Sequence, residues 1–590
     1  MKRGVLAAFC LLCLVTVIPY LQVLYNGFCI VDDPAYIVDN QIIRQGLNRT
    51  TLEWSFTNPL MGHFAPLTWL THGLDSELFG DWAGGHHLTS LLVHLLAAVL
   101  LFRVLLKLEL SLIPSFLGAA LFASHPMGVE AVAWASSKKD LLSGLFWLLA
   151  FNCYLNHHRR SQYSSSKWYW LALGCMLLGG VCKSSIIALP LLLVAFDLFG
   201  TDPLRISRYF RSRLFLGKLP FFALSIAVGA ATIWFQDQVA GFDRESLEPW
   251  AALLRALSLA QHYLFNAVAP LELVFPEAPL NTAGLEAVLA LFIFVLVTSL
   301  TWRLRRDLPL IFCGWIWFCI ALLPVLQLVP VGLQEYSNRW GYIALMGLAV
   351  IAAQCFHAAL STSRQLLRGG VLGGALVIGA TFSVLTCQQV QLWRSDLALF
   401  STALKRNPNN VQARLYLGAA LSRAGALPQA ANEFLVALKL EPTSFSAFSN
   451  LHRTLELLGR GSEIISYIPT APLLKGQDNL AQIVTLIGFN TSLAEQYRNK
   501  TGKDALGVAY SYWSQKLKES PRSFLAAYQL GNISSHQGQY ERALDFALRA
   551  MEQRRWNSAV HALLAQIYRG LNQGEGASRH IYKAWWFNPQ

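Results

Sequence analysis

Long apolar segments recur through the first 390 residues, and they constrain the fold more than any other feature of the chain. The first runs from Gly4 to Leu24, and about 20 apolar residues are enough for a helix to cross a bilayer. Hydrophobic residues make up 54% of the chain and charged ones only 14%, against about 25% charged in a soluble protein. Because lipid offers no partners to the backbone, these runs predict a bundle of helices that crosses a membrane many times.

The basic residues between the apolar runs predict the topology of this bundle. Lys and Arg are enriched in cytoplasmic loops, so Met1-Lys2-Arg3 is expected inside, followed by a long outer loop. If residues 250–275 crossed the membrane, Arg303, Arg305 and Arg306 would fall outside; we therefore predict an interfacial or re-entrant outer element there. The net charge of +13 is thus explained by basic residues in the loops between spans, and no nucleic-acid partner is expected. The pattern predicts about eleven spans, at 4–24, 87–106, 112–128, a fourth ending near His157, 168–182, 185–199, 219–235, 284–302, 308–328, 341–359 and 369–389.

The last two hundred residues are less apolar and repetitive. A 34-residue period is typical of tetratricopeptide repeats, in which small residues let two antiparallel helices pack closely. The segment 445–523 is irregular and is expected to hold two degenerate repeats and an insertion. We predict an all-α chain with a membrane domain at 1–390, containing an outer loop at 25–86, and an extracytoplasmic repeat solenoid at 391–590. The repeat residues are Leu417, Gly418, Leu421, Gly425, Ala430, Phe434, Ala437 and Pro442, and later Leu530, Gly538, Ala543, Ala550, Leu564, Ala577 and Ala584.

Phe400, Ala403 and Pro408 precede Phe434, Ala437 and Pro442 by one repeat length. This spacing indicates that the solenoid begins directly after the last span. We therefore expect a stiff joint between the two domains.

The predicted topology gathers acids and bases at the outer ends of the spans. Charged groups beside a membrane are costly and indicate a functional site by default. Asp32-Asp33 follows the first span, and either carboxylate is suited to accept a hydroxyl proton while nearby cations stabilise a leaving phosphate. The other members of this group are His63, His72, Asp75, His86, His87, His125, Glu130, Lys138, Lys139, Asp140, Lys183, Glu335 and Arg339.

Several of these residues have a structural alternative. For His86 and His87, a role as interfacial anchors is favoured over a role as ligands. His125 and Glu130 flank a turn, and a structural role in which their side chains hydrogen-bond this turn is as well supported as a functional one. Lys183 and Arg339 are lone cations between apolar stretches and are better candidates for binding an anion. The spacing of His72 and Asp75 on a helix suits a metal pair, but a satisfied surface pair is favoured.

The same residues fall into a recognisable pattern. It comprises Asp32-Asp33-Pro34, Pro66-Leu67-Thr68, Gly85-His86-His87-Leu88, His125-Pro126 to Trp134, Lys139-Asp140-Leu141-Leu142-Ser143, Lys183 with Pro190, and Asn338-Arg339-Trp340-Gly341-Tyr342. The chain resembles the transmembrane-and-tetratricopeptide-repeat glycosyltransferases of the C-type (GT-C) superfamily, which includes the protein O-mannosyltransferases, and looks most similar to bacterial members. It departs from many relatives at Asn338 and Ala65.

This resemblance implies an enzyme that moves a sugar from a polyprenyl-phosphate carrier to a hydroxyl acceptor, expected on protein Ser or Thr. It implies Asp32 as the base with Asp33 as its orienting or metal-contacting neighbour. Lys183, Arg339 and Lys139 would bind the donor phosphate, and His125, Glu130, His86 and His87 would support the site. A need for a divalent metal is left open, and no other cofactor is implied.

We expect the protein in a bacterial inner membrane with periplasmic repeats that hold the protein acceptor, or in the endoplasmic reticulum membrane with lumenal repeats in a eukaryote. Two alternatives stay open. One is transfer to a lipid or glycan, and the other is a non-catalytic membrane-anchored scaffold for envelope assembly.

Overall fold

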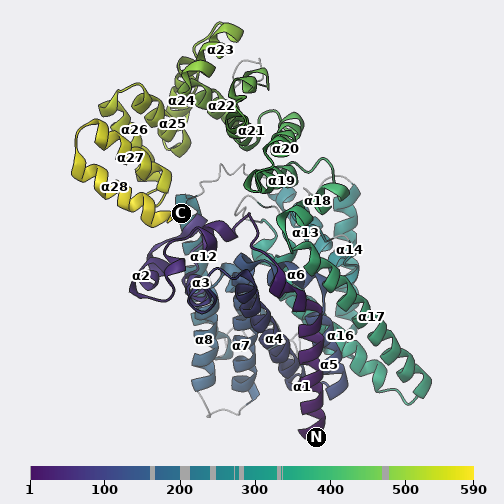
Figure 1. Ribbon diagram of the computed structural model, residues 1–590. Helices are drawn as coiled ribbons and strands as arrows, with labels where there is room; N and C mark the ends of the chain where they lie inside the picture. Colours follow the sequence, from purple (N-terminus) through teal and green to yellow (C-terminus); the bar gives the residue numbers. More distant parts are fainter. Residues whose placement is uncertain are drawn as a thin grey trace.

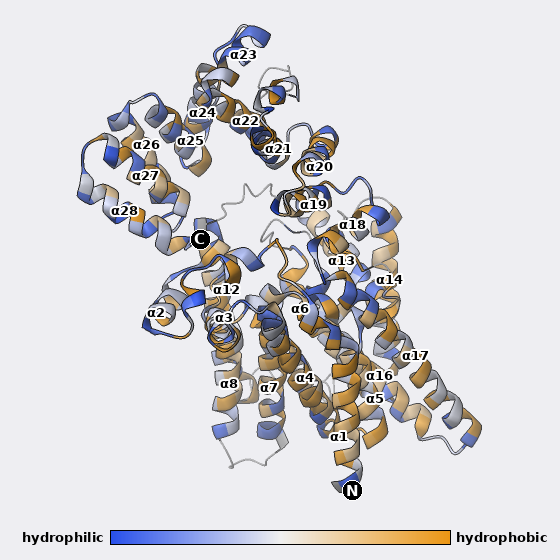
Figure 2. Cartoon of the chain, viewed as in Figure 1, coloured by the Kyte–Doolittle hydropathy of each residue, from blue (hydrophilic) through white to orange (hydrophobic). Residues whose placement is uncertain are grey.

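The computed structural model describes residues 2–159, 166–198, 213–239, 248–271, 273–277, 285–328, 334, 336–467 and 477–589. Every regular element in these ranges is a helix, which confirms the predicted all-α fold. Figure 1 shows a bundle of long helices and, on one end of it, a solenoid of short helix pairs. The bundle is mainly hydrophobic and the solenoid is mixed (Figure 2).

Each predicted span corresponds to a helix or to two consecutive helices of the bundle. The segment 250–275, which was predicted not to cross the membrane, also contains a helix. This helix, α13 (Pro249–Val268), packs on α14 and lies towards the end of the bundle that faces the solenoid (Figure 1). The bundle comprises α1 (Lys2–Val17) with η1 (Ile18–Tyr25), α4 (Ala83–Lys107), α5 (Leu112–Ala123), α7 (Lys138–Arg159), α8 (Ser166–Gly180), η7 (Ser184–Ala188) with α9 (Leu189–Leu198), α12 (Leu219–Val239), α14 (Leu285–Leu304), α15 (Pro309–Leu322), α16 (Tyr342–Leu360) and α17 (Gln365–Leu392).

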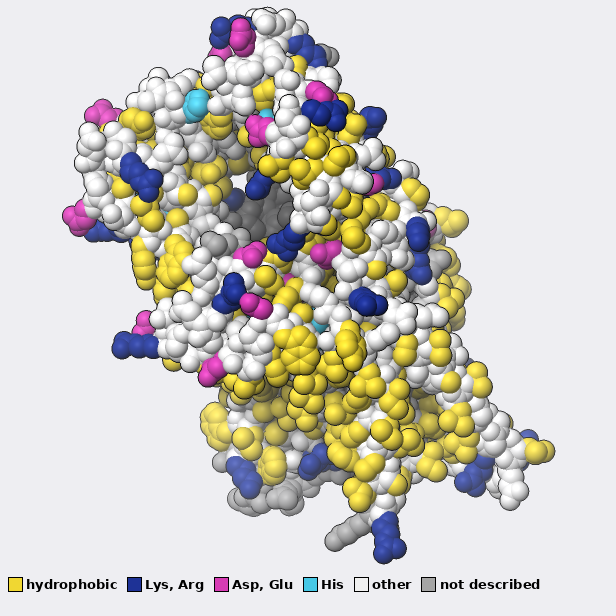
Figure 3. Space-filling view, viewed as in Figure 1, with side chains coloured by type: hydrophobic (Ala, Val, Ile, Leu, Met, Phe, Trp, Pro, Cys, Tyr) yellow, Lys and Arg dark blue, Asp and Glu magenta, His cyan; other side chains and the backbone are white. Residues whose placement is uncertain are grey.

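Six helices of the described ranges are long and apolar enough to cross a membrane, and a bent pair adds a seventh candidate. That pair joins α5 to η5 (Pro126–Gly128) and α6 (Val129–Ala133) through a bend of 50°. The protein is therefore a multi-pass membrane protein, whereas the number of eleven spans stays a prediction. On the face shown in Figure 3, hydrophobic side chains cover the bundle, and Lys and Arg side chains lie at the end away from the solenoid.

Short helices of the outer loop cover the solenoid-facing end of the bundle. Tyr36, Trp54 and Trp69 are fully buried among them and form a small core of their own. This core fixes the loop that follows α1 and η1, and it therefore fixes the positions of Asp32 and Asp33. The loop contains η2 (Pro34–Val38), η3 (Ile43–Gln45), α2 (Arg49–Thr57), η4 (Leu60–Gly62) and α3 (Pro66–Phe79).

The solenoid follows the predicted repeat closely where the sequence is regular. Polar residues cap the first helix of successive repeats by accepting a bond from the backbone three residues later, as Asn410, Ser444, Ser523 and Asn557 do. Residues 468–476, within the expected insertion, lie outside the described residues. The helices are α18 (Asp396–Arg406), α19 (Val411–Arg423), α20 (Leu427–Leu440), α21 (Phe445–Leu457), η11 (Gly461–Tyr467), α22 (Asp478–Phe489), α23 (Thr491–Thr501), α24 (Ala505–Glu519), α25 (Phe524–His536), α26 (Tyr540–Gln553), α27 (Ser558–Gly570) and α28 (Gly574–Phe587).

The joint between the two parts is bonded to the outer loop beside the aspartates. Asp396, at the start of α18, accepts a hydrogen bond from the backbone N–H of Ile30 at 3.0 Å. The backbone N–H of Gly27 donates to the carbonyl of Arg394 at 3.2 Å. The hydrophobic core of the bundle also continues into α18 through Phe400. These contacts provide the physical basis for a stiff joint.

The far end of the solenoid returns to the bundle, which the sequence did not indicate. The indole N–H of Trp54 on α2 donates to the main-chain carbonyl of Trp586 at 2.8 Å. The ring of Trp234, near the end of α12, lies 4.7 Å from that of Trp556. The solenoid therefore forms an arch that is supported at both ends, and Figure 3 shows a hollow between the arch and the bundle.

Candidate active site

The two aspartates of the outer loop differ sharply in their surroundings. Asp33 is fully buried; one oxygen accepts from the backbone N–H of Cys29 at 2.7 Å, and the other accepts from the backbone N–H of Ser136 at 2.9 Å and from its hydroxyl. Burial raises the pKa of Asp33 from 3.8 to about 7, although these hydrogen bonds oppose the shift. Asp32 is half-buried, and its carboxylate makes no hydrogen bond or ion pair with any described residue. This geometry favours Asp32 as the reactive carboxylate and Asp33 as the residue that holds the loop.

A buried lysine lies next to this loop. Lys139, in the first turn of α7, donates to the hydroxyl of Tyr36 at 3.0 Å and lies 4.7 Å from the centre of its ring. Its side chain forms no ion pair within the described part of the chain, and Asp32 is the acid that attracts its charge most strongly. Burial raises the pKa of Tyr36 well above its ordinary value, so its hydroxyl stays protonated. Lys139 is therefore a cation free to bind an incoming anion.

The other two predicted phosphate ligands, Arg339 and Lys183, are lone cations in the sequence but have acidic partners in the fold, and their binding of a phosphate stays a prediction. Arg339, in η10 (Asn338–Gly341), forms an ion pair with Glu130 of α6, and Lys183 forms one with Asp140 of α7. The two pairs meet where Nε of Arg339 lies 4.0 Å from a carboxylate oxygen of Asp140. The acidic partners could not be identified from the sequence, because they lie far from Arg339 and Lys183 along the chain and approach them only in the folded protein. A donor phosphate would join these pairs as a further anion.

Aromatic rings hold the guanidinium of Arg339 in place. Its Cζ lies 4.5 Å from the ring centre of Trp134 and 5.7 Å from that of Trp340. Nζ of Lys183 lies 5.8 Å from the same Trp340 ring. Such cation–π contacts restrict both cations at the end of the bundle beneath the solenoid.

Three of the predicted histidines, His125, His86 and His87, have structural partners. His125 accepts from the backbone N–H of Met127 at 3.1 Å, and its Nε2 lies 2.8 Å from the carbonyl oxygen of Ala267, so it ties the turn as the structural alternative predicted. His86 and His87 are fully buried, so the prediction that they are interfacial anchors is wrong. They are covered because α3 and the loop after η1 pack closely over the start of α4. A Cβ on Gly85 would lie 2.2 Å from the Phe79 ring, which explains the glycine before them.

His72 and Asp75 also differ from expectation. Both lie on α3 and are buried, with exposed fractions of 0% and 1%, so the favoured surface pair is wrong. Asp75 forms an ion pair with Lys138, which is buried as well and is not an ordinary loop charge. Because both oxygens of Asp33 already accept hydrogen bonds, Asp33 is a poor metal ligand, and the structure directs attention to His72 and Asp75 instead.

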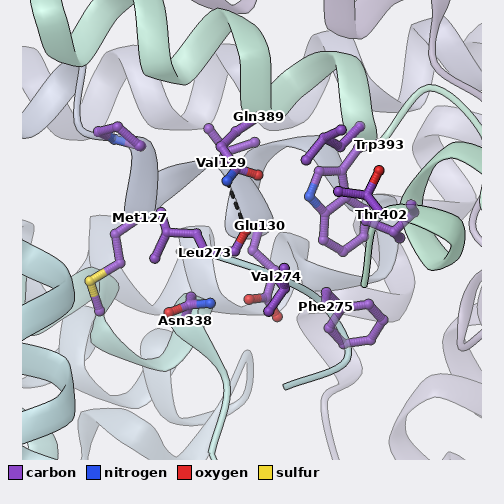
Figure 4. A pocket seen from close by; sticks show the side chains of 13 residues that line it. Met127, Val129, Glu130, Leu273, Val274, Phe275, Asn338, Gln389, Trp393 and Thr402 are labelled. Carbon is purple, nitrogen blue, oxygen red and sulfur yellow. Dashed lines mark hydrogen bonds between the residues drawn. The ribbon is translucent and has the colours of Figure 1, made fainter. Parts of the chain in front are cut away.

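A small pocket lies beside Glu130 and Asn338 (Figure 4). Its other walls are mainly apolar and come from η5, the segment around Leu273 and the joint between α17 and α18, including Trp393. The amide of Gln389 donates to the carbonyl of Leu273 at 2.8 Å within this pocket. Asp32, Lys139 and Lys183 do not line it.

Sequence reasoning missed two residues of the site. Ser136 supplies two of the three hydrogen bonds to Asp33, and Tyr36 bonds Lys139. Ser136 lies three residues before Lys139, but a serine beside a charged pair has no distinguishing pattern. Only the contact with a loop about a hundred residues away reveals its role.

Known proteins resemble this chain in sequence over both the bundle and the solenoid. No protein-family model matches the chain. The chain is 25% identical over 626 residues to the human protein named protein O-mannosyl-transferase TMTC3, covering 97% of the chain and 67% of that protein. It is 34% identical over 204 residues to Drosophila melanogaster protein O-mannosyl-transferase Tmtc2, covering 32% of the chain and 21% of the relative. The chain spans 64% of mouse TMTC3 and 58% of Drosophila Tmtc3, so much of each relative has no counterpart here.

Among solved structures, ArnT from Cupriavidus metallidurans bound to undecaprenyl phosphate overlaps 81% of this chain and 82% of its own. The identity is 14% and the TM-score is 0.39, which is too low to establish a shared fold. The sequence relatives, which match the chain from the bundle into the solenoid, confirm the resemblance on which the site residues were predicted. The chain is a homologue of the transmembrane and tetratricopeptide-repeat proteins named protein O-mannosyl-transferases.

Proposed function

We propose that the protein is a membrane glycosyltransferase that moves a sugar from a polyprenyl-phosphate carrier to a Ser or Thr hydroxyl of a protein. The observation that carries this proposal is the contrast between the unbonded carboxylate of Asp32 and the fully bonded carboxylate of Asp33, with the buried cation Lys139 beside them. The names of the relatives supply the reaction class.

In the proposed reaction, Asp32 accepts the proton of the acceptor hydroxyl as its oxygen attacks the anomeric carbon of the sugar. The bond from that carbon to the phosphate oxygen breaks, and the electron pair stays on the polyprenyl phosphate. Lys139, Lys183 and Arg339 stabilise the phosphate as its negative charge grows. Asp33 does not react, because Ser136 and the backbone of Cys29 use its oxygens to fix the loop.

The arrangement also suits a hydrophobic donor and an extended acceptor. The bundle gives a polyprenyl chain access from the bilayer, and the hollow beneath the arch gives a polypeptide access from the aqueous side (Figure 3). We propose that residues 1–390 form the catalytic domain and residues 391–590 hold the protein acceptor. The positive-inside rule supports a cytoplasmic amino terminus and repeats in the periplasm of a bacterium, or in the lumen of the endoplasmic reticulum in a eukaryote.

The test is transfer of radiolabelled mannose from polyprenyl-phosphate-mannose to protein by the full chain in proteoliposomes. Asp32→Asn should lower transfer by about 10²–10⁴-fold, because it removes the base. Asp39→Asn is the matched control, since Asp39 lies on the same loop, is exposed and contacts Arg423 at 3.6 Å; it should keep full activity.

Equal activity of the Asp32→Asn variant would refute the assignment of the base. Labelling of lipid or glycan without protein would instead favour the second enzymatic function. If the unmodified chain transfers no sugar from any polyprenyl-phosphate hexose, the non-catalytic scaffold is favoured.

A further inference from the structure

A second cluster of polar groups is buried beside the site but takes no part in the proposed reaction. His72 and Asp75 lie one turn apart on α3, and His86 lies in the first turn of α4. Their exposed fractions are 0%, 1% and 0%. One nitrogen or oxygen atom from each lies within 4.8 Å of the others, and no other group of this kind occurs among the residues described.

The hydrogen bonds of His86 determine which of its nitrogen atoms carries a proton. Its Nε2 lies 3.1 Å from the carbonyl oxygen of Gly80, which only accepts, so Nε2 is the N–H of a neutral ring. Its Nδ1 is then an unprotonated acceptor, and it lies 3.7 Å from a carboxylate oxygen of Asp75. Nδ1 of His86 therefore has no donor, while the Asp75 oxygen that it faces accepts from Lys138 and, at 3.0 Å, from the hydroxyl of Thr89. A metal ion bound to both residues would give Nδ1 of His86 the partner that it lacks.

His72 supplies an independent observation. Neither of its ring nitrogens has a hydrogen-bond partner, although the side chain is completely buried. Buried polar groups in proteins are almost always bonded, so two unpartnered nitrogens in one ring require an explanation. A metal ion would use one nitrogen of His72 and the bare Nδ1 of His86 at the same time.

We propose that His72, Asp75 and His86 bind a divalent metal ion of the zinc class. Two imidazole nitrogens and one carboxylate oxygen are a ligand set that zinc prefers, and a fourth position is left for water. The bond from His86 to the carbonyl of Gly80 matches the outer partner that metal-bound histidines usually have. The ion would tie α3 to α4 and brace the outer loop on which Asp32 lies.

Lys138 is the competitor for this site. Its ammonium group forms an ion pair with Asp75, so a metal ion and Lys138 would attract the same carboxylate and repel each other. Removal of the lysine charge should therefore strengthen metal binding. The effect of removing Lys138 on metal affinity therefore distinguishes a metal site from a simple ion pair between Lys138 and Asp75 that binds no metal.

The test is the zinc content of the full chain, purified in detergent after growth with zinc and measured by mass spectrometry. We expect about one zinc ion per chain, its loss in His72→Ala and His86→Ala, and its retention in His87→Ala. His87 is the matched control because it is equally buried next to His86, but its bond is to the carbonyl of Gly27 and it does not belong to the group of three.

A second variant keeps the proposal falsifiable if the alanine variants fold poorly. Lys138→Met retains all three ligands and should bind zinc about tenfold more tightly or better, with a larger rise in unfolding temperature when zinc is added. The proposal is overturned if the unmodified chain neither contains zinc nor gains thermal stability from it. It is also overturned if both histidine variants keep their zinc, or if zinc binds only after Lys138 is removed.

Discussion

Asp33→Asn tests whether burial controls the ionisation of the paired aspartates. Burial raises the pKa of Asp33 from 3.8 to about 7, so between these values the folded protein holds a proton that the unfolded chain has released. Folding therefore loses free energy as pH rises from about 4 to about 7. Each pKa unit corresponds to about 1.4 kcal/mol, so a shift of about three units amounts to roughly 4 kcal/mol.

The asparagine variant carries no titrating group at this position. Its stability relative to the unmodified chain should therefore rise with pH by roughly 4 kcal/mol and become constant above about pH 8. The amide places N–H groups where Asp33 accepts bonds from Cys29 and Ser136, and this adds a cost that does not depend on pH. The prediction therefore concerns how the stability difference between the two proteins changes with pH, and not its absolute value.

The assay is chemical unfolding of the detergent-solubilised chain, followed by tryptophan fluorescence at several pH values between 4 and 9. The other carboxylates titrate in both proteins, so their contributions cancel in the difference. Asp39→Asn, at an exposed position of the same loop, should give a difference that is constant within about 0.5 kcal/mol. A difference for Asp33→Asn that stays constant between pH 4 and 8, or that falls with pH, would refute the reasoning.

Three further perturbations test the packing around the site. Arg339→Met leaves Glu130 as a buried charge without its ion pair and should cost about 3–5 kcal/mol in chemical unfolding; a much smaller loss would mean that water reaches Glu130. Trp54→Phe removes the indole bond to the α28 main chain and should speed hydrogen exchange in α28 while leaving α19 unchanged, and exchange that does not change would contradict a supported arch. Gly418→Ala places a Cβ about 2.6 Å from the Phe434 ring and should destabilise the first repeat by about 1–3 kcal/mol, measured by exchange in α19 and α20; normal protection there would show that the ring can move aside.

The helices and the order of the two parts were predictable because their signals are local. An apolar run of span length specifies a membrane helix whatever it packs against, and a 34-residue period specifies the pairing of neighbouring helices. Capping residues such as Asn410 and Ser444 act on a backbone group three residues away, so they too can be read from the sequence.

The candidate site was predictable only in part, for a reason that Asp33 and Arg339 illustrate. The sequence predicted that charged residues gather at one end of the spans, because lipid excludes them from the middle. The tertiary structure decided their partners: Asp33 bonds Ser136 across 103 residues, and Arg339 pairs with Glu130 across 209. Such contacts carry no periodicity, so Lys183 and Arg339 looked alone until the fold supplied their carboxylates.

The same distinction separates the solenoid from its attachment. Repetition in the sequence determined that the last two hundred residues stack as helix pairs, because each pair must bury its apolar face against the next. Only the tertiary structure decided that the stack curves back until Trp586 meets Trp54, 532 residues earlier, and leaves a hollow between the solenoid and the bundle. Curvature is a sum of small rotations between repeats, and no single residue specifies it.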